Sequence, residues 1–196
     1  MLNQLRPAIC MIALFTGVLG VAYPLAVTGV AQAAFPVQAN GSLVRDETGH
    51  VIGSALVGQS FTDATYLHPR PSAAGGGYDA SASSGSNLGP LNEDLAERVN
   101  ETALILKSEN PNAPVPADAV TTSASGLDPH VSPQYAALQI PRIAKARSVG
   151  EAQVREIINQ HTEGRVLGVI GQPRVNVLMA NRALDERFGR KVAREA

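Results

Sequence analysis

Residues 8–30 of the chain read AICMIALFTGVLGVAYPLAVTGV, and this stretch decides how the protein is organised. It carries no charged side chain, and the charge-free region around it extends from Pro7 to Val44. A helix of about 23 residues is long enough to cross a hydrocarbon layer about 30 Å thick. The stretch therefore predicts one membrane-spanning helix, with residues 1–34 as cytoplasmic N-terminus and anchor and residues 35–196 as an extracytoplasmic soluble domain.

A cleaved secretory signal is the alternative interpretation of the same stretch. Residues 31–34 (AQAA) match the small-x-small cleavage pattern, with Ala34 as the first residue of a mature chain. The apolar core of a signal usually extends about 7–15 residues, and this run is longer, which favours the anchor. Arg6 precedes the run, and positive charge is retained on the cytoplasmic side. In both interpretations the rest of the chain faces outward from the cell membrane.

The composition excludes several classes of protein. Sixteen basic and seventeen acidic residues give a formal net charge of -1, which disfavours a nucleic-acid partner. Cys10 is the only cysteine and lies in the apolar stretch, so the soluble part has neither disulfide nor thiolate metal site. The sequence contains neither the G-x-x-x-x-G-K-[ST] phosphate loop nor the G-x-S-x-G serine-hydrolase motif. We therefore expect no catalytic residues.

The soluble region is predicted to be α+β, a single mixed domain after the one transmembrane helix. Short runs rich in Val, Leu and Ile at residues 41–45 and 50–58 flank a polar turn and predict a β-hairpin. Residues 68–90 are dense in Pro, Gly and Ser and predict a long loop. We expect a brief strand at residues 119–122 and a buried strand at residues 175–179.

Four helices are predicted from apolar periodicity and from capping residues. The first helix has an apolar face at helical spacing, formed by Leu91, Leu95, Val99, Ala103 and Leu106. Ser132 is the expected N-cap of the second helix, and Ser148 the expected N-cap of the third, in a capping box with Glu151. The expected spans are residues 90–107, 133–147, 148–161 and 183–194.

A metal site is not expected from the histidines. His68, Asp128 and His130 lie in separate loops without a diagnostic ligand spacing. The simpler interpretation is that each side chain holds its own loop in place, with Asp128 capping the turn before the second helix. The secretory alternative would instead make the His68 and His130 loops the site of a secreted or membrane-tethered binding or hydrolytic domain.

Several longer stretches occur together in a fixed order. They are GQSF at residues 58–61, YLHPRPSA at 66–73, SGSNLGP at 84–90, SGLDPHVSP at 125–133 and PRVNVL at 173–178. With the single anchor and the chain length, these stretches resemble the C subunits of the Kdp potassium-transporting ATPases. The resemblance extends over essentially the whole chain.

This resemblance implies a non-catalytic accessory subunit of a high-affinity potassium uptake complex. Its partners would be a potassium-binding channel-like subunit, a P-type ATP-hydrolysing subunit, a small single-span subunit and membrane lipid. The family is described as a catalytic chaperone that raises the ATP affinity of the hydrolysing subunit. With the domain outside, we expect no cofactor on this chain and an effect of ATP only through the complex; direct contact with ATP requires a domain inside. The partner-contact candidates are Gln59, Tyr66, His68, Arg70, Asn87, Asp128, His130 and Asn176.

Overall fold

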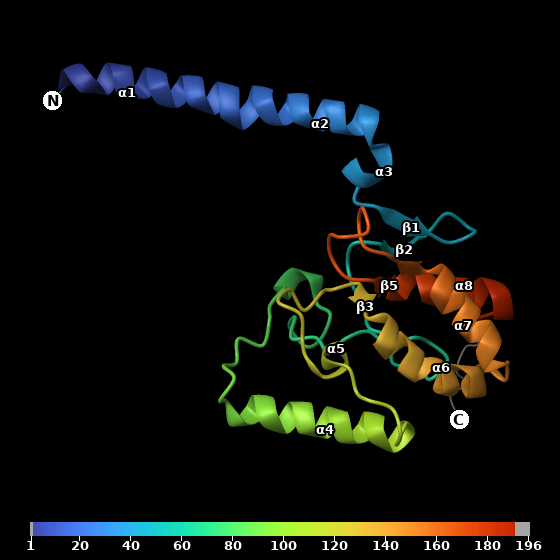
Figure 1. Ribbon diagram of the computed structural model, residues 1–196. Helices are drawn as coiled ribbons and strands as arrows, with labels where there is room; N and C mark the ends of the chain where they lie inside the picture. Colours follow the sequence, from blue (N-terminus) through green and yellow to red (C-terminus); the bar gives the residue numbers. More distant parts are fainter. Residues whose placement is uncertain (1, 191–196) are drawn as a thin grey trace. The chain divides into compact units, whose positions relative to one another are not determined.

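The computed structural model describes residues 2–190. The chain divides into two compact units, Met1–Ile52 and Gly53–Ala196, with the boundary inside a short strand. Figure 1 labels most of the helices and strands of both units. The α+β class predicted from the sequence is confirmed, because an N-terminal apolar helix is followed by a mixture of helices and short strands.

The N-terminal unit is dominated by one long helix. It is built from α1 (Leu2–Phe15), the π-helical turn η1 (Thr16–Ala22) and α2 (Tyr23–Ala34). Pro24 has no N–H to donate and would crowd the carbonyl of Gly20, four residues earlier. Gly20 lies within the π-helical turn η1. Within the 31-residue helix Gln4–Ala34, the most apolar 18-residue stretch has a mean hydropathy of 2.1 and no buried share, so by length and composition the helix can cross a membrane.

A short helix and the predicted hairpin follow the long helix. The helix α3 (Pro36–Ala39) precedes β1 (Leu43–Arg45), which pairs with β2 (Val51–Ser54). The Asp46 carboxylate accepts hydrogen bonds from the N–H groups of Thr48 and His50, each at 2.9 Å. These bonds close the turn that the polar residues between the two apolar runs predicted.

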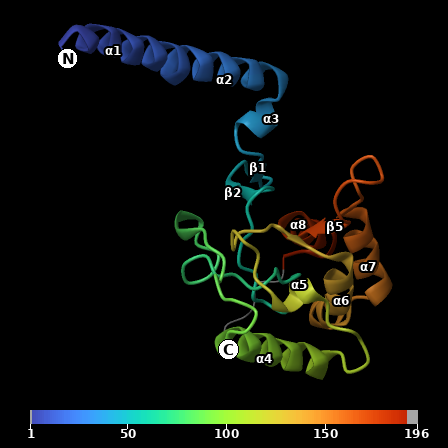
Figure 2. The same cartoon turned by 60° about the vertical axis from the view of Figure 1, so that its left-hand side comes forward.

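The second unit carries the remaining elements (Figures 1 and 2). Its helices are η2 (Ala80–Ala82, 3-10), α4 (Glu93–Glu109), α5 (Ala117–Val120), α6 (Pro133–Arg147), α7 (Glu151–Gln160) and α8 (Val177–Phe188). An antiparallel sheet in the order β3-β5-β4 joins β3 (His130–Val131), β5 (Arg174–Asn176) and β4 (Thr162–Glu163). The predicted loop over residues 68–90 is confirmed, apart from the single turn η2.

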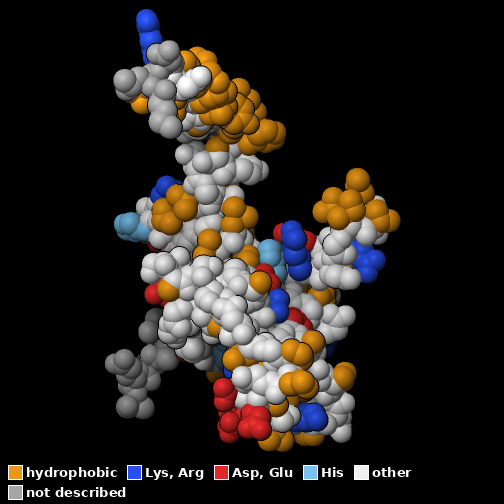
Figure 3. All heavy atoms as spheres, turned by 90° about the vertical axis from the view of Figure 1, so that its left-hand side faces the viewer, with side chains coloured by type: hydrophobic (Ala, Val, Ile, Leu, Met, Phe, Trp, Pro, Cys, Tyr) orange, Lys and Arg blue, Asp and Glu red, His pale blue; other side chains and the backbone are white. Residues whose placement is uncertain are grey.

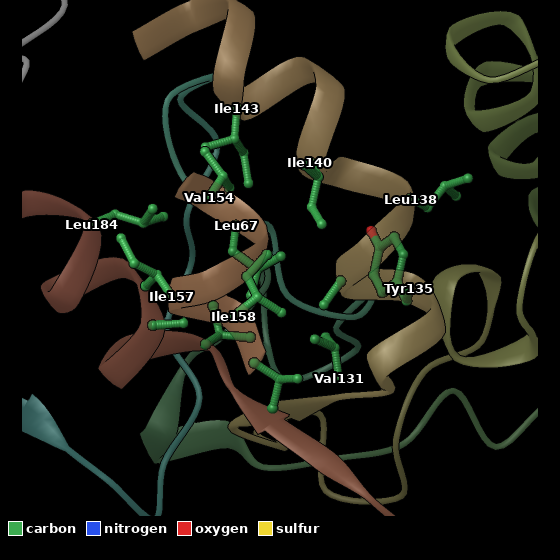
Figure 4. Close-up of a cluster of buried hydrophobic side chains, with 14 of the residues drawn as sticks. Leu67, Val131, Tyr135, Leu138, Ile140, Ile143, Val154, Ile157, Ile158 and Leu184 are labelled. Atoms are coloured by element: carbon green, nitrogen blue, oxygen red, sulfur yellow. The ribbon is translucent and has the colours of Figure 1, made fainter. Parts of the chain in front are cut away.

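The core of the second unit lies where α6, α7, α8 and the sheet meet (Figure 4). The side chains of Leu67, Ile143, Val154 and Leu184 are each 0% exposed. Leu67 comes from an irregular segment, while the others come from three different helices. Packing of helix faces against one loop segment therefore holds that segment in the middle of the domain.

The second predicted helix is confirmed and the start of the third is corrected. Ser132 accepts a hydrogen bond from the Tyr135 N–H at 3.0 Å and so caps α6 as expected. Ser148 ends α6 in the left-handed conformation, at φ 57°, and does not begin α7. An N-cap needs an extended backbone, which Gly150 has, and the Gln153 side chain accepts from the Gly150 N–H at 3.2 Å.

Three other expectations are corrected. The strand expected at residues 119–122 is the short helix α5, because Asp118 faces the start of α6 and accepts from the Ser132 N–H and O–H. The strand expected at residues 175–179 ends at Asn176, whose side chain accepts from the Met179 N–H and begins α8. The terminal helix therefore starts earlier than residue 183, and residues 191–194 of the prediction lie outside the described residues.

The first helix of the soluble region is confirmed as α4. The Asn92 side chain accepts from the Leu95 N–H and sets its start. Leu91, expected on its apolar face, precedes the helix and is 96% exposed. Val99 and Ala103 pack against the core as the periodicity predicted.

Candidate functional site

Four of the predicted contact residues meet where the long loop, β3 and β5 come together. Asp128 accepts a hydrogen bond from Arg70 Nη1 at 3.0 Å and another from the His130 N–H at 3.0 Å. His130 stands opposite Asn176 in the β3–β5 pairing. Asn176 donates through Nδ2 to the Ala55 carbonyl at 2.8 Å. We call Arg70, Asp128, His130 and Asn176 the loop cluster.

The Asp128 carboxylate is the electrostatic centre of the loop cluster. Burial alone would raise its pKa, but hydrogen bonds from His130 and the Arg70 guanidinium outweigh burial and lower the pKa below the ordinary value. Asp128 is therefore an anion throughout the neutral range. His130 Nδ1 lies 3.5 Å from the same carboxylate. Arg70 and Asp128 are partly exposed, at 21% and 29% of their side chains, so a partner can reach them.

Close backbone contacts fix the shape of the loops beside the cluster. The Gly58 N–H donates to the Leu127 carbonyl at 2.8 Å, and a Cβ on Gly58 would lie 2.6 Å from the Asp128 carbonyl oxygen. Gly126 has a φ of +67°, and a Cβ there would lie 2.6 Å from the Ala74 N–H nitrogen. Only glycine fits these two approaches, and the chain carries glycine at both.

A second group of candidates lies on residues 64–69, an irregular segment that belongs to no strand and buries Leu67. Asn181 binds both backbone groups of Leu67, accepting from its N–H at 2.7 Å and donating to its carbonyl at 2.9 Å. Gln139 does the same for His68, at 2.8 and 3.1 Å. Side-chain amides from α6 and α8 thus replace the ladder that a neighbouring strand would provide.

Arginines bind three further carbonyls of this segment. Arg142 donates to the carbonyls of Ala64 and Tyr66, at 2.7 and 3.1 Å. Arg147, whose side chain is fully buried, donates to the Thr65 carbonyl at 2.7 Å. These four polar side chains, Gln139, Arg142, Arg147 and Asn181, were missed at the sequence level. Their only signal is a polar residue among the apolar positions of a helix.

The side chains of Tyr66 and His68 are held in place by contacts with other residues of the same domain. The Tyr66 hydroxyl donates to Asp185 at 2.9 Å, and the Arg147 guanidinium lies 5.1 Å from the ring centroid. Burial, then the hydrogen bond to Asp185, raises the pKa of Tyr66. His68 Nε2 lies 2.9 Å from the Asp63 carbonyl. Burial, with the nearby Arg142 charge, lowers the pKa of His68, so its imidazole is neutral at neutral pH.

The other two candidates lie outside the loop cluster contacts. Asn87 is exposed, has a φ of 54° and donates to the Ser84 hydroxyl at 3.5 Å. Gln59 is half-buried, and its side chain fills the space beside Gly53, where a Cβ would lie 2.3 Å from its Nε2. Gln59 therefore packs against the start of the second unit, and Asn87 is part of an exposed loop.

The residues considered for a metal site are divided between two neighbourhoods. His68 contacts Asp63 and Gln139, whereas Asp128 contacts Arg70 and His130. Within residues 2–190, no group of three or more His, Cys, Asp or Glu side chains is arranged to hold a metal ion. The loop cluster combines a cation, an anion and two side chains able to hydrogen bond, which suits polar recognition of another protein surface.

Comparison with known proteins identifies the family. The profile described as K+-transporting ATPase, c chain, matches residues 5–186. The chain belongs to the KdpC family. A Potassium-transporting ATPase KdpC subunit from a Caulobacter species is 63% identical over 188 residues, which is 96% of each chain. The KdpC subunit of Myxococcus xanthus is 59% identical, covering 87% of this chain and 82% of that protein.

A third relative extends the agreement to a more distant sequence. The KdpC subunit of Bradyrhizobium diazoefficiens is 51% identical over 197 residues, covering 94% of this chain and 98% of that protein. The family assignment that the sequence motifs suggested is therefore confirmed. The protein is a membrane-associated KdpC subunit of a potassium-transporting ATPase, with one apolar helix able to span the membrane.

Proposed function

We propose that this KdpC chain is a non-catalytic accessory subunit that stabilises the Kdp complex from the outer face of the membrane. In this proposal the long helix is the anchor, and the soluble domain caps the outer mouth of the potassium-conducting subunit. The observation that carries the proposal is the helix Gln4–Ala34, whose most apolar 18-residue stretch has no buried share. A helix with such a surface requires lipid or other helices around it.

The proposed orientation follows from charge. Arg6 precedes the apolar run, while the next charged residue, Arg45, comes after it. A short cytoplasmic N-terminus with the positive charge inside leaves the soluble domain outside. Protease added to intact spheroplasts should therefore digest the soluble domain. A domain that survives this treatment is inside, which contradicts the proposal and favours direct contact with ATP.

The proposed contact with the partner subunits is the loop cluster. Arg70 and Asp128 are partly exposed, and the hydrogen bonds and glycine contacts described above keep them in one arrangement. A rigid polar group loses little conformational entropy on binding, which favours its use at an interface. In this scheme ATP use changes only through the membrane subunits, and the chain holds no cofactor of its own.

Two aspartates allow a matched test of this contact. Asp128→Asn removes the charge that Arg70 faces, while Asp46→Asn changes an aspartate of similar turn geometry in the exposed hairpin. We expect Asp128→Asn to lower the amount of complex that co-purifies with this subunit and to slow potassium uptake at low external potassium. Asp46→Asn should leave both unchanged. Equal behaviour of the two variants contradicts a role for the loop cluster.

The accessory role itself is tested by deletion of residues 53–196 with the anchor kept. We expect the remaining subunits to be recovered in smaller amounts or to take up potassium abnormally. An intact complex with unchanged transport contradicts the proposal. N-terminal sequencing of the membrane-bound chain is the companion measurement, because a chain that begins at Ala34 has lost its anchor by signal cleavage.

A further inference from the structure

The hairpin between β4 and β5 has an aliphatic tip that the loop cluster does not involve. Val166, Leu167, Val169 and Ile170 are 60%, 88%, 74% and 60% exposed. Val166 and Ile170 pair through two backbone hydrogen bonds of 2.9 and 3.0 Å, which hold the hairpin closed. The loop that precedes β5 projects from the domain in Figure 2, and Figure 3 shows hydrophobic side chains gathered on a projection of this kind. We call residues 166–170 the aliphatic tip.

The backbone of the tip does not suit the residue at its end. Leu167 and Gly168 have φ values of 53° and 76°, and the Val169 N–H donates to the Val166 carbonyl at 3.2 Å. Positive φ at both central residues is the pattern of a type I′ turn, which favours Asn-Gly. Leucine is strained in that conformation, because its Cβ crowds the backbone. Turn formation therefore does not account for Leu167, and neither does packing, because its side chain is exposed.

Arginines lie at the base of the same hairpin. Arg165 donates to the Gln172 side chain at 3.0 Å, and Arg174 pairs with Glu163 at 2.8 Å. With Glu163 neutralising one charge, the base carries one net positive charge. An aliphatic end above a positive base matches the layers of a bilayer surface, in which phosphate groups cover hydrocarbon. The tip has no aromatic or hydrogen-bonding side chain of the kind that dominates protein interfaces.

We propose that the aliphatic tip inserts into the acyl chains of the bilayer that holds the anchor helix. This inference rests on the proposed membrane anchoring. Four aliphatic side chains would bind a membrane weakly on their own. The anchor in the same chain makes this contact intramolecular and so raises the effective concentration of the bilayer. The tip would then be a second membrane contact of the chain, beside the anchor helix, and would limit how the soluble domain moves over the membrane.

The position of the tip can be measured in the full-length chain. Cys10 is the only cysteine, so a Cys10→Ala chain carrying Leu167→Cys can be labelled with an environment-sensitive dye. In nanodiscs of phosphatidylethanolamine and phosphatidylglycerol, we expect a blue shift of the dye and quenching by lipids spin-labelled on their acyl chains. The control is Leu104→Cys on α4, also exposed, at 68%, which should show neither effect.

The outcomes separate this inference from the proposed function. A chain that fails to co-elute with nanodiscs contradicts the membrane anchor. A chain that co-elutes, but whose dye at residue 167 stays in water, overturns only the inference. Shielding of that dye only after the other Kdp subunits are added also overturns it, because the tip would then contact protein.

The strained turn offers a second variant, in which a loss of lipid contact cannot be attributed to a folding defect. Asn suits the positive φ at residue 167, so Leu167→Asn should keep or raise the unfolding temperature. With the dye moved to Val169→Cys, the same substitution should reduce quenching by the acyl-chain labels. A lowered unfolding temperature with unchanged quenching would mean that Leu167 serves the fold and does not contact lipid.

Discussion

At the scale of single residues, the segment 64–69 stands out because side chains, and not a neighbouring strand, bind its backbone groups. It belongs to no strand and buries Leu67 in the core, and buried backbone groups must find partners. Asn181, itself 1% exposed, satisfies both groups of Leu67. The buried polar side chain of Asn181 in α8 is therefore explained by its hydrogen bonds to the backbone of segment 64–69. The same segment carries Tyr66 and His68.

Asn181→Leu should destabilise the domain by about 2 to 4 kcal/mol, because two buried backbone groups of Leu67 lose their partner in a site of similar volume. Chemical unfolding of the detergent-solubilised chain, followed by the tyrosine near-UV signal, measures the change. Asn159→Leu on the exposed face of α7 is the matched control and should change stability by about 0.5 kcal/mol or less. Equal effects at both positions would contradict this account of Asn181.

His68 makes stability depend on pH. Burial, then the Arg142 charge, holds its pKa in the folded state below the ordinary value of 6.5. As pH falls through 6.5, the unfolded chain binds a proton before the folded chain does. Stability from the neutral imidazole is thus fully present above that value and is lost as pH falls toward the lowered pKa.

Unfolding midpoints compared between about pH 7.5 and about pH 5 should therefore fall more in the wild type than in His68→Gln, which has no titrating side chain at position 68. The Asp128 carboxylate, whose pKa is lowered, contributes in a separate and more acidic range, below 3.8. Parallel slopes for the two proteins would show that His68 is not protonated differently in the folded and unfolded states.

At the scale of elements, α6 organises the second unit. It contacts α7 and β5, and its inner face supplies many of the buried apolar side chains (Figure 4). Its start could be predicted because the cap at Ser132 and the proline after it act within one turn. The start of α7 could not, because Ser148 has the right side chain for a cap but the left-handed backbone that ends α6.

Ile143→Ala should lower the free energy of unfolding by about 2 to 5 kcal/mol, since the removed methyl groups leave a cavity in the core. The isoleucine is 0% exposed in α6. Ile105 on α4 is 61% exposed, so Ile105→Ala is the same chemical change without a cavity. Denaturant titration of both variants measures the difference, and a similar small loss for both would place the core elsewhere.

At the scale of the whole molecule, we expect membrane association to depend on the long N-terminal helix. An arginine at the centre of a spanning helix costs about 2.5 to 3.5 kcal/mol. Replacing Leu14 and Leu19 by Arg should therefore reduce the chain recovered in carbonate-washed membranes. Leu56 and Leu91 are exposed in the second unit, at 63% and 96%, and their replacement by Arg should not. Full retention of the first double variant would mean that another segment holds the chain in the membrane.

Local patterns in the sequence determined the apolar helix, the hairpin, the long loop, α4 and the start of α6, because hydropathy, turn residues and caps act over a few positions. The family also followed from ordered motifs. Only the tertiary structure decided which polar residues meet. Arg70 and Asp128 are 58 positions apart, and Leu67 and Asn181 are 114 apart. Such contacts depend on how α6, α8 and the sheet pack, and no local pattern encodes that packing.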